Sequence, residues 1–464
     1  MEPNHNGQIK HNDLIEVAEN IINIAKRYDC AAQVTMIQSD AKEISVRNQE
    51  IEKLLTSVAI STGVRLFKGK KSTIIAFSGE DFDNMEAKIK EALQNLGYLS
   101  EDEYKRLLTP REFGAGEPAP ALDLADNGYD AIDIKQVKTA LQRIESSALA
   151  FSPLITPADL AEFSSSRIKI YLFTSAGVKK SYIKTNYAFS YTAVAHDKTK
   201  DLRERDYWSE SKRYFTDLPP METIGHIGET AAEKAIKRLG GKKIKSGERK
   251  IVFSRRTAGS LLDLLCDALD GEELVLKNSF LVDRLGQTLF PEIITIMDDP
   301  LMDKFPGSYP FDGEGMNGIK KPVIEKGRLL SYLHNSYSAG KLNMELTGNA
   351  STSISSAPHI KVGNCFLQAG QGSLDDLVRE MKEGLLVDDM YVSGMNSVTG
   401  DFSFGCSGFL VKKGKIAGPV KEITIAGNLL ELYKNVIAVA DDNLWKSSIT
   451  SPSILVEKLA VAGT

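Results

Sequence analysis

The order of predicted helices and strands in the first half of the chain constrains its fold most. An amphipathic helix over about residues 13–25 precedes strand-like runs that begin at Ala31, Lys42 and Ser57. A hairpin partner follows Gly69, and a second helix is predicted over about 81–96. Helices that flank a group of strands are typical of an α+β unit with an antiparallel sheet. The sequence therefore favours such a unit over a doubly wound nucleotide-binding fold.

The same order recurs after a segment rich in proline and glycine, PREFGAGEPAP. A helix over about 131–146, alternating strands, and a helix over about 224–239 follow it. This repetition suggests a duplicated α+β unit. We expect an N-terminal subdomain over residues 1–109, a linker over 110–121 and a second α+β subdomain over 122–245.

The remainder of the chain, residues 246–464, has a different character. Short runs of β-branched residues alternate with glycine turns, and one helix is predicted over about 373–383. This pattern predicts a β-rich C-terminal domain of barrel or sandwich type. The whole chain is therefore assigned to the α+β class.

Composition excludes several classes of protein. A formal net charge of -5 provides no electrostatic basis for binding nucleic acid. No apolar run approaches the roughly 20 residues that span a bilayer, so no membrane segment is expected. The N-terminus lacks an apolar secretory segment. The four cysteines are Cys30, Cys266, Cys365 and Cys406. They lie far apart in the sequence and form no C-x-x-C pair, as expected for a protein of the reducing cytoplasm.

A helix is predicted from Gly259 to Leu269, ended by Gly271. Its leucines recur at helical spacing and form one apolar face. Asp263, Asp267 and Asp270 occupy the opposite face. Such a stripe could hold a hard cation, although acidic helix faces are more often solvated.

Two further stretches are candidate substrate or partner loops. The acidic, glycine-rich GSYPFDGEG contains Phe311, Asp312, Glu314 and Gly315, and suits a backbone that approaches a ligand, a partner or its own core closely. The second stretch contains Asp401, Ser403 and Cys406. Cys406 is either a nucleophile or, more commonly for such a residue, part of the core.

Familiar catalytic motifs are absent from the sequence. It contains no G-x-x-x-x-G-K-[ST], no dinucleotide-binding glycine pattern and no G-x-S-x-G. The histidines are not arranged as H-x-x-x-H or H-E-x-x-H. The residues by themselves therefore identify no catalytic constellation.

Four segments carry a resemblance to a known family. They are GSYPFDGEGMNGIKKPVIEKGRLLSYLHNSYSAGKL, TGNAS, TGDFSFGCSGFLVKKGKIAGPVKEITIAGNL and SILVEKLAVAG. With them, the chain resembles the TldD/PmbA proteins, historically called modulators of DNA gyrase. The resemblance spans nearly the whole chain and is more specific in its second half.

The resemblance also indicates a branch of that family. The TldD branch carries the zinc motif H-E-x-x-x-H after a Gly-x-Leu-Leu lead-in, and a further cysteine ligand near the C-terminus. Here Asp263 replaces the first histidine, Leu264 the glutamate, and Asp267 or Ala268 the second histidine. No cysteine follows Cys406. The resemblance therefore implies the PmbA/TldE branch, with no catalytic residue and no metal ligand in this chain.

This branch carries an expected function. The resemblance implies a non-catalytic subunit of a TldD/TldE-like metallopeptidase that cleaves small or unfolded peptides, with zinc bound by a TldD-type partner. We expect a homodimer when that partner is missing. One alternative is a stand-alone regulatory protein-binding module, for example one related to gyrase. Another is a homodimeric hydrolase that uses Cys406 or the Asp312/Glu314 loop.

Overall fold

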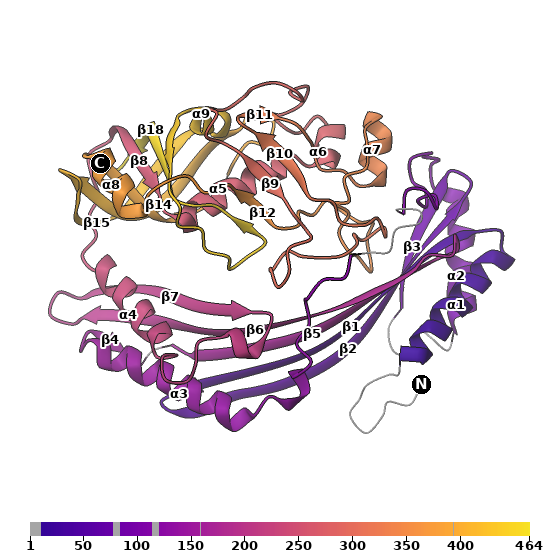
Figure 1. Ribbon diagram of the computed structural model, residues 1–464, viewed down its shortest axis with the longest axis horizontal. Coiled ribbons are helices and arrows are strands. Elements are labelled where there is room, and N and C mark those ends of the chain that lie inside the picture. Colours follow the sequence, from indigo (N-terminus) through magenta and orange to yellow (C-terminus); the bar gives the residue numbers. More distant parts are fainter. Residues whose placement is uncertain (1–10, 78–83, 114–119, 158, 393) are drawn as a thin grey trace.

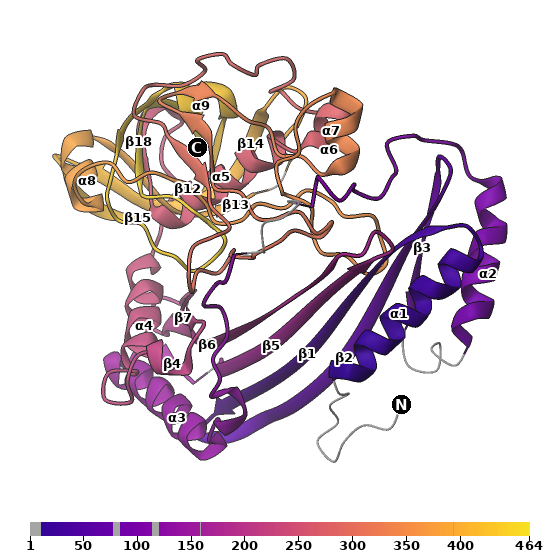
Figure 2. The same cartoon turned by 45° about the vertical axis from the view of Figure 1, so that its right-hand side comes forward.

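The computed structural model describes residues 11–77, 84–113, 120–157, 159–392 and 394–464. A long, curved antiparallel sheet forms one part of the molecule, and a β-rich C-terminal domain lies over one face of that sheet (Figures 1 and 2). Helices cover the other face. The predicted α+β class is confirmed.

The curved sheet contains strands from both predicted α+β subdomains. The first contributes α1 (His11–Arg27), β1 (Ala31–Arg47), β2 (Glu50–Lys68), β3 (Lys71–Phe77) and α2 (Met85–Asn95). The second contributes α3 (Ile134–Phe151), β4 (Ile155–Thr156), β5 (Ala161–Thr174), β6 (Lys179–Asp197), β7 (Leu202–Lys212) and α4 (His226–Arg238). The strand order is β3-β2-β1-β5-β6-β4, with β7 also paired to β6. Since β1 and β5 pair continuously from Gln33↔Thr174 to Val46↔Ala161, the two subdomains share one sheet.

One strand prediction was wrong. The run from Lys42 is not one strand, because the chain turns at Asn48 and Gln49, whose φ angles are 51° and 66°. Positive φ at two successive residues is the geometry of a tight hairpin turn. The fully buried carboxylate of Glu145, on α3, accepts hydrogen bonds from both backbone N–H groups at 2.8 Å. A distant side chain thus stabilises a turn that lacks the usual glycine.

Two apolar clusters join the helices to the sheet. At one end, α1 and α2 pack on β1, β2 and β3 through residues such as Ile21, Val34 and Val64. At the other end, α3 and α4 pack on β5 and β6 through residues such as Ile144, Phe163 and Phe189. Even-numbered residues of β1 face the helices, so its odd-numbered residues face the C-terminal domain.

The C-terminal domain begins with β8 (Gly247–Phe253), α5 (Arg255–Ala268), α6 (Gly271–Val275), β9 (Ile296–Asp298), β10 (Lys321–Glu325), β11 (Arg328–Leu329), α7 (Ser336–Leu342), β12 (Cys365–Leu367) and α8 (Leu374–Met381). It continues with β13 (Gly384–Tyr391), β14 (Asp401–Lys412), β15 (Lys415–Asn428), α9 (Leu429–Lys434), β16 (Val436–Val439), β17 (Ile449–Thr450) and β18 (Ile454–Ala462).

Strands β15, β14, β13, β8 and β18 close into a barrel, because β15 also pairs with β18. Strand β16 extends from β18, and a separate small sheet has the order β11-β10-β9-β12-β17. The predicted barrel-type domain is therefore present.

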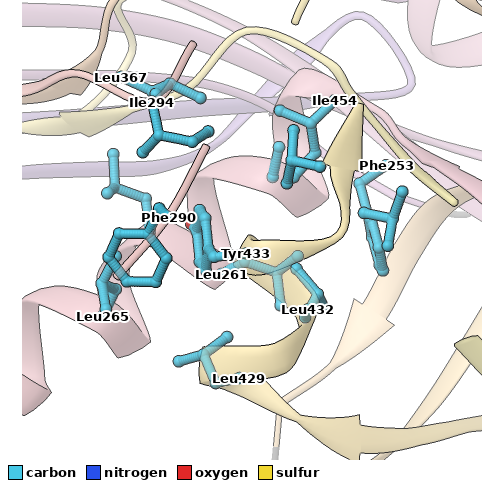
Figure 3. Packing of buried hydrophobic residues seen from close by; sticks show 14 of the residues in the cluster. Phe253, Leu261, Leu265, Phe290, Ile294, Leu367, Leu429, Leu432, Tyr433 and Ile454 are labelled. Atoms are coloured by element: carbon cyan, nitrogen blue, oxygen red, sulfur yellow. The ribbon is translucent and has the colours of Figure 1, made fainter. Parts of the chain in front are cut away.

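Helix α5 packs in the core of this domain. Leu261 and Leu265 lie against Phe290 and Tyr433, and barrel residues such as Phe253 and Ile454 belong to the same cluster (Figure 3). The helix begins at Arg255, four residues before the predicted start, because the chain enters it directly from β8. Within the described ranges, every helix is too short or too polar to span a bilayer.

Candidate functional site

The positions that correspond to the zinc motif lie on α5. Asp263 and Asp267 are exposed, Leu264 is half-buried against the core, and Ala268 is buried. Although both side chains reach solvent, partial desolvation by the protein around them raises the pKa of Asp263 and of Asp267, and the charges of Asp263 and Glu273 add to the increase at Asp267. Asp270, the third residue of the predicted acidic stripe, instead caps α6 by accepting a hydrogen bond from the Glu272 N–H at 2.7 Å.

These side chains do not fit a zinc site. Protein zinc sites use imidazole and thiolate ligands, with carboxylates in addition, in a set of three or four. Leucine and alanine provide no donor atom, which leaves two aspartates on one helix. Among the described residues, no group of three or more His, Cys, Asp or Glu side chains could hold a metal ion.

A large cleft opens beside the start of α5. Its volume is about 1210 Å³, and residues of the C-terminal domain, of β7 and of α4 line it. Asp263 is one of its lining residues. Others from α5 are Arg255, Arg256 and Gly259, and from β7 Tyr207 and Trp208. The helix that would carry a zinc motif therefore borders this cleft.

An ion-pair network crosses the junction next to this cleft. The buried carboxylate of Asp206, on β7, contacts Arg238 Nε at 2.8 Å and Arg256 Nη1 at 3.3 Å. Arg238 also reaches Asp388 and Asp389 on β13, at 3.3 and 2.8 Å. Burial acts to lower the pKa of Arg238, but the surrounding carboxylates outweigh it and the pKa is raised. The spacing of residues in the sequence gave no sign of this network, because its members are distant in the chain.

The acidic loop that contains Asp312 is buried and bound by its own chain. Asp312 accepts hydrogen bonds from the backbone N–H groups of Glu314, Met316 and Ala350. Burial raises the pKa of Asp312 to about 7, and the neighbouring Glu314 acts in the same direction. Gly313 permits a close approach: a Cβ atom there would lie 1.8 Å from the Ser351 carbonyl oxygen.

The same loop joins the C-terminal domain to the curved sheet. Glu314 accepts hydrogen bonds from the N–H and hydroxyl of Ser336, both at 2.7 Å, and forms an ion pair with Arg65 on β2 at 3.2 Å. The Gly315 carbonyl accepts a hydrogen bond from Lys180 on β6 at 2.7 Å. Phe311 packs edge-on against Tyr182 with ring centroids 5.1 Å apart. The structure thus brings the four predicted loop residues together, at an internal junction.

The second candidate stretch lies on β14, where residues alternate between two faces. Asp401 and Ser403 are exposed, while Cys406 points into the barrel core. Asp401 accepts hydrogen bonds from Thr399 and Asn428. Burial raises the pKa of Cys406 to about 12, with Asp389 acting in the same direction. A nucleophilic cysteine needs a lowered pKa, so the geometry does not favour catalysis by Cys406.

Burial of the thiols leads to a direct prediction. Cys30, Cys266, Cys365 and Cys406 are all buried free thiols, and the sulfur atoms of Cys266 and Cys365 are 3.3 Å apart. We expect a maleimide reagent at neutral pH to label none of them in the native protein within minutes, and all of them after denaturation. Mass spectrometry of the labelled protein measures this. Rapid native labelling of Cys406 would restore the case for a nucleophile.

Comparison with protein families gives three matches along the chain. Residues 246–463 match the PmbA/TldA metallopeptidase C-terminal domain, residues 128–239 the central domain, and residues 32–96 domain 1. Together they cover both subdomains of the curved sheet and the C-terminal domain.

Individual proteins are similar over nearly the full length. The chain is 32% identical to a metalloprotease PmbA homolog of Haemophilus influenzae, with 95% of this chain and 94% of that protein covered. A crystal structure of a proposed modulator of DNA gyrase from Bacteroides thetaiotaomicron has a TM-score of 0.89 and 26% identity, covering 98% of this chain and all of that one. TldE from Thermococcus kodakarensis has the same fold, with a TM-score of 0.80 at 21% identity over 96% of this chain and all of that chain.

Proposed function

Because the chain belongs to the PmbA/TldD metallopeptidase family, we propose that it is the non-catalytic, PmbA/TldE-type subunit of a two-subunit peptidase. In this proposal a TldD-type partner binds the zinc ion and cleaves small or unfolded peptides. This chain contributes a wall of the space in which the peptide lies.

The composition of α5 carries this proposal. A hydrolytic zinc site needs ligands and a base that activates the bound water. In this chain the corresponding positions hold Asp263, Leu264, Asp267 and Ala268, and Leu264 packs against the core instead of presenting a carboxylate. The cleft beside the helix is nevertheless about 1210 Å³, which is ample for several residues of an extended peptide. The described lining of this cleft contains no histidine or cysteine, and its carboxylates form no cluster that could hold a metal ion, so the cleft suits peptide binding better than hydrolysis.

The test compares this chain alone, a TldD-type subunit alone, and the two mixed. We expect peptide cleavage and about one bound zinc ion per heterodimer in the mixture, and neither from this chain by itself. Cleavage is followed by mass spectrometry of an unfolded peptide, and zinc by elemental analysis. Stoichiometric zinc and peptide cleavage by the isolated chain would contradict the proposal.

Size-exclusion chromatography with light scattering on the same samples reports the assembly. We propose that the isolated chain forms a homodimer and that the partner replaces one copy. If the mixture neither assembles nor gains activity, the alternative of a regulatory binding protein, in line with the gyrase-related name of the Bacteroides relative, becomes the better account.

A further inference from the structure

The walls of the large cleft combine apolar and basic side chains. Its apolar lining includes Tyr207, Trp208, Leu386, Phe409 and Ile416, which come from both sides of the domain junction. Its basic lining consists of Lys234, Lys237, Arg255, Arg256 and Lys446. A basic side chain can bind an anionic ligand in the cleft only if it is not already paired with a carboxylate of the protein.

Three of these basic side chains already have carboxylate partners. Arg256 pairs with Asp206 and Asp389, at 3.3 and 3.2 Å. Lys234 lies 3.9 Å from Asp206, and Lys237 pairs with Glu233 at 2.6 Å. These charges are therefore largely compensated within the protein.

Arg255 and Lys446 are different. Neither makes an ion pair with a carboxylate in the described ranges. Arg255 Nη1 donates to the Asp442 carbonyl oxygen at 3.3 Å, and Lys446 Nζ donates to the Ser209 carbonyl oxygen at 2.6 Å. Lys446 Nζ also lies 3.1 Å from the centre of the Trp208 ring. These neutral contacts position the two cations, and no carboxylate of the described residues forms a direct ion pair with either of them.

None of the described acidic residues that line the cleft forms an ion pair with Arg255 or Lys446. Asp388 belongs to the Arg238 network, and the Asp442 carboxylate accepts hydrogen bonds from the N–H and hydroxyl of Ser453, both at 2.7 Å. Asp263 and Asp375 are exposed, and neither reaches Arg255 or Lys446.

The burial and the neighbouring charges of Lys446 favour an anionic ligand beside it. Burial lowers the pKa of Lys446 to about 8, and the nearby Lys234, Arg255 and Arg256 act in the same direction. The Glu210 carboxylate, which accepts a hydrogen bond from Trp208 Nε1 at 3.0 Å, is the largest single charge effect on Lys446 and opposes this shift, but burial and the three cations together outweigh it. A partly desolvated cation among other cations gains from an anionic ligand.

We propose that Arg255 and Lys446 together bind a carboxylate group of a peptide that lies in this cleft, with the apolar wall around Trp208 and Phe409 holding the adjoining side chains. That the ligand is a peptide rests on the proposed function. That it presents a carboxylate rests on the two cations that form no ion pair with a described residue. The carboxylate comes either from the C-terminus of the peptide or from an acidic side chain.

Isothermal titration calorimetry on the full chain tests this with three peptides. The first is acetyl-Ala-Phe-Ala-Leu with a free C-terminal carboxylate, the second is its C-terminal amide, and the third is an amide in which aspartate replaces the second alanine. We expect the free acid to bind at least about tenfold more tightly than the first amide, as is typical of a charge-assisted hydrogen bond. If the third peptide binds as tightly as the free acid, an acidic side chain is sufficient to supply the carboxylate.

Matched variants test whether Arg255 and Lys446 cause the difference in affinity. Lys446→Gln and Arg255→Gln keep polar donors for the neighbouring carbonyl groups. Each substitution should weaken binding of the free-acid peptide by about tenfold and leave binding of the amide peptide unchanged. Lys135→Gln removes one positive charge from the exposed face of α3, away from the cleft, and should change the affinity for neither peptide. Equal binding of acid and amide, or unchanged binding in both cleft variants, would overturn the proposal.

These outcomes are separate from the outcome for the proposed function. Carboxylate-dependent binding by the isolated chain can hold even if a TldD-type subunit gains no activity from it. Conversely, activity in the mixture with equal binding of acid and amide would retain the subunit role and reject the carboxylate site.

Discussion

Replacing Asp206 by alanine should lower the free energy of unfolding by about 3 to 5 kcal/mol, the range for removing one partner from a buried ion pair. Its side chain is 1% exposed and lies in contact with Arg238 and Arg256, with Lys234 at 3.9 Å. The variant would leave these cations together, with only Asp388 and Asp389 to compensate them. Because the network joins β7 and α4 to β13 and α5, the loss should also loosen the wall of the cleft.

Urea unfolding followed by circular dichroism measures the difference. Asp441→Ala is the matched control, since Asp441 is exposed and its side chain makes no hydrogen bond or ion pair within the described ranges. That control should change stability by no more than about 0.5 kcal/mol. Asp206→Asn keeps the shape of the side chain and loses its charge, so its loss of unfolding free energy should lie between those of Asp206→Ala and Asp441→Ala. Equal stability of Asp206→Ala and Asp441→Ala would show that the network contributes little.

Replacing Glu314 by glutamine should cost about 2 to 3 kcal/mol of stability, because it breaks the junction between the curved sheet and the C-terminal domain. The carboxylate is nearly inaccessible and binds Ser336 on α7 and Arg65 on β2 at the same time. Glutamine keeps one carbonyl oxygen for Ser336, but it leaves the Arg65 guanidinium, whose side chain is 14% exposed, without a counterion.

Glu103→Gln provides the matched comparison for this junction. Glu103 also pairs with a basic residue, Lys70, at 3.4 Å, but both side chains are more than half exposed. Exposed ion pairs contribute roughly 0 to 1 kcal/mol, so the free energy of unfolding of this variant should be close to that of the unsubstituted chain. Chemical unfolding of the two variants side by side checks the prediction. A similar small loss in both would mean that the loop is held chiefly by Asp312 and by the close contact at Gly313.

Helix α5 could be located from the sequence through its resemblance to the segment that carries the zinc motif. The apolar face of α5, with Leu261 and Leu265, is buried as its spacing predicted, and Asp263 and Asp267 are exposed as a polar face should be. The spacing could not show that the exposed face borders a cleft. Other lining residues of that cleft, Tyr207 and Trp208, come from β7, which lies far earlier in the chain.

The types of most elements, their order, and the change from α+β subdomains to a β-rich C-terminal domain could be predicted from the sequence alone, because helical and strand periodicity are local properties of the chain. The folded structure was needed to show that β1 and β5 unite two subdomains in one sheet, that Glu314 binds Arg65 and Ser336, and that Arg255 and Lys446 form no ion pair among the described residues. Strand partners and ion pairs depend on contacts between residues far apart in the chain. Hydrophobic spacing within a single segment carries no information about those contacts.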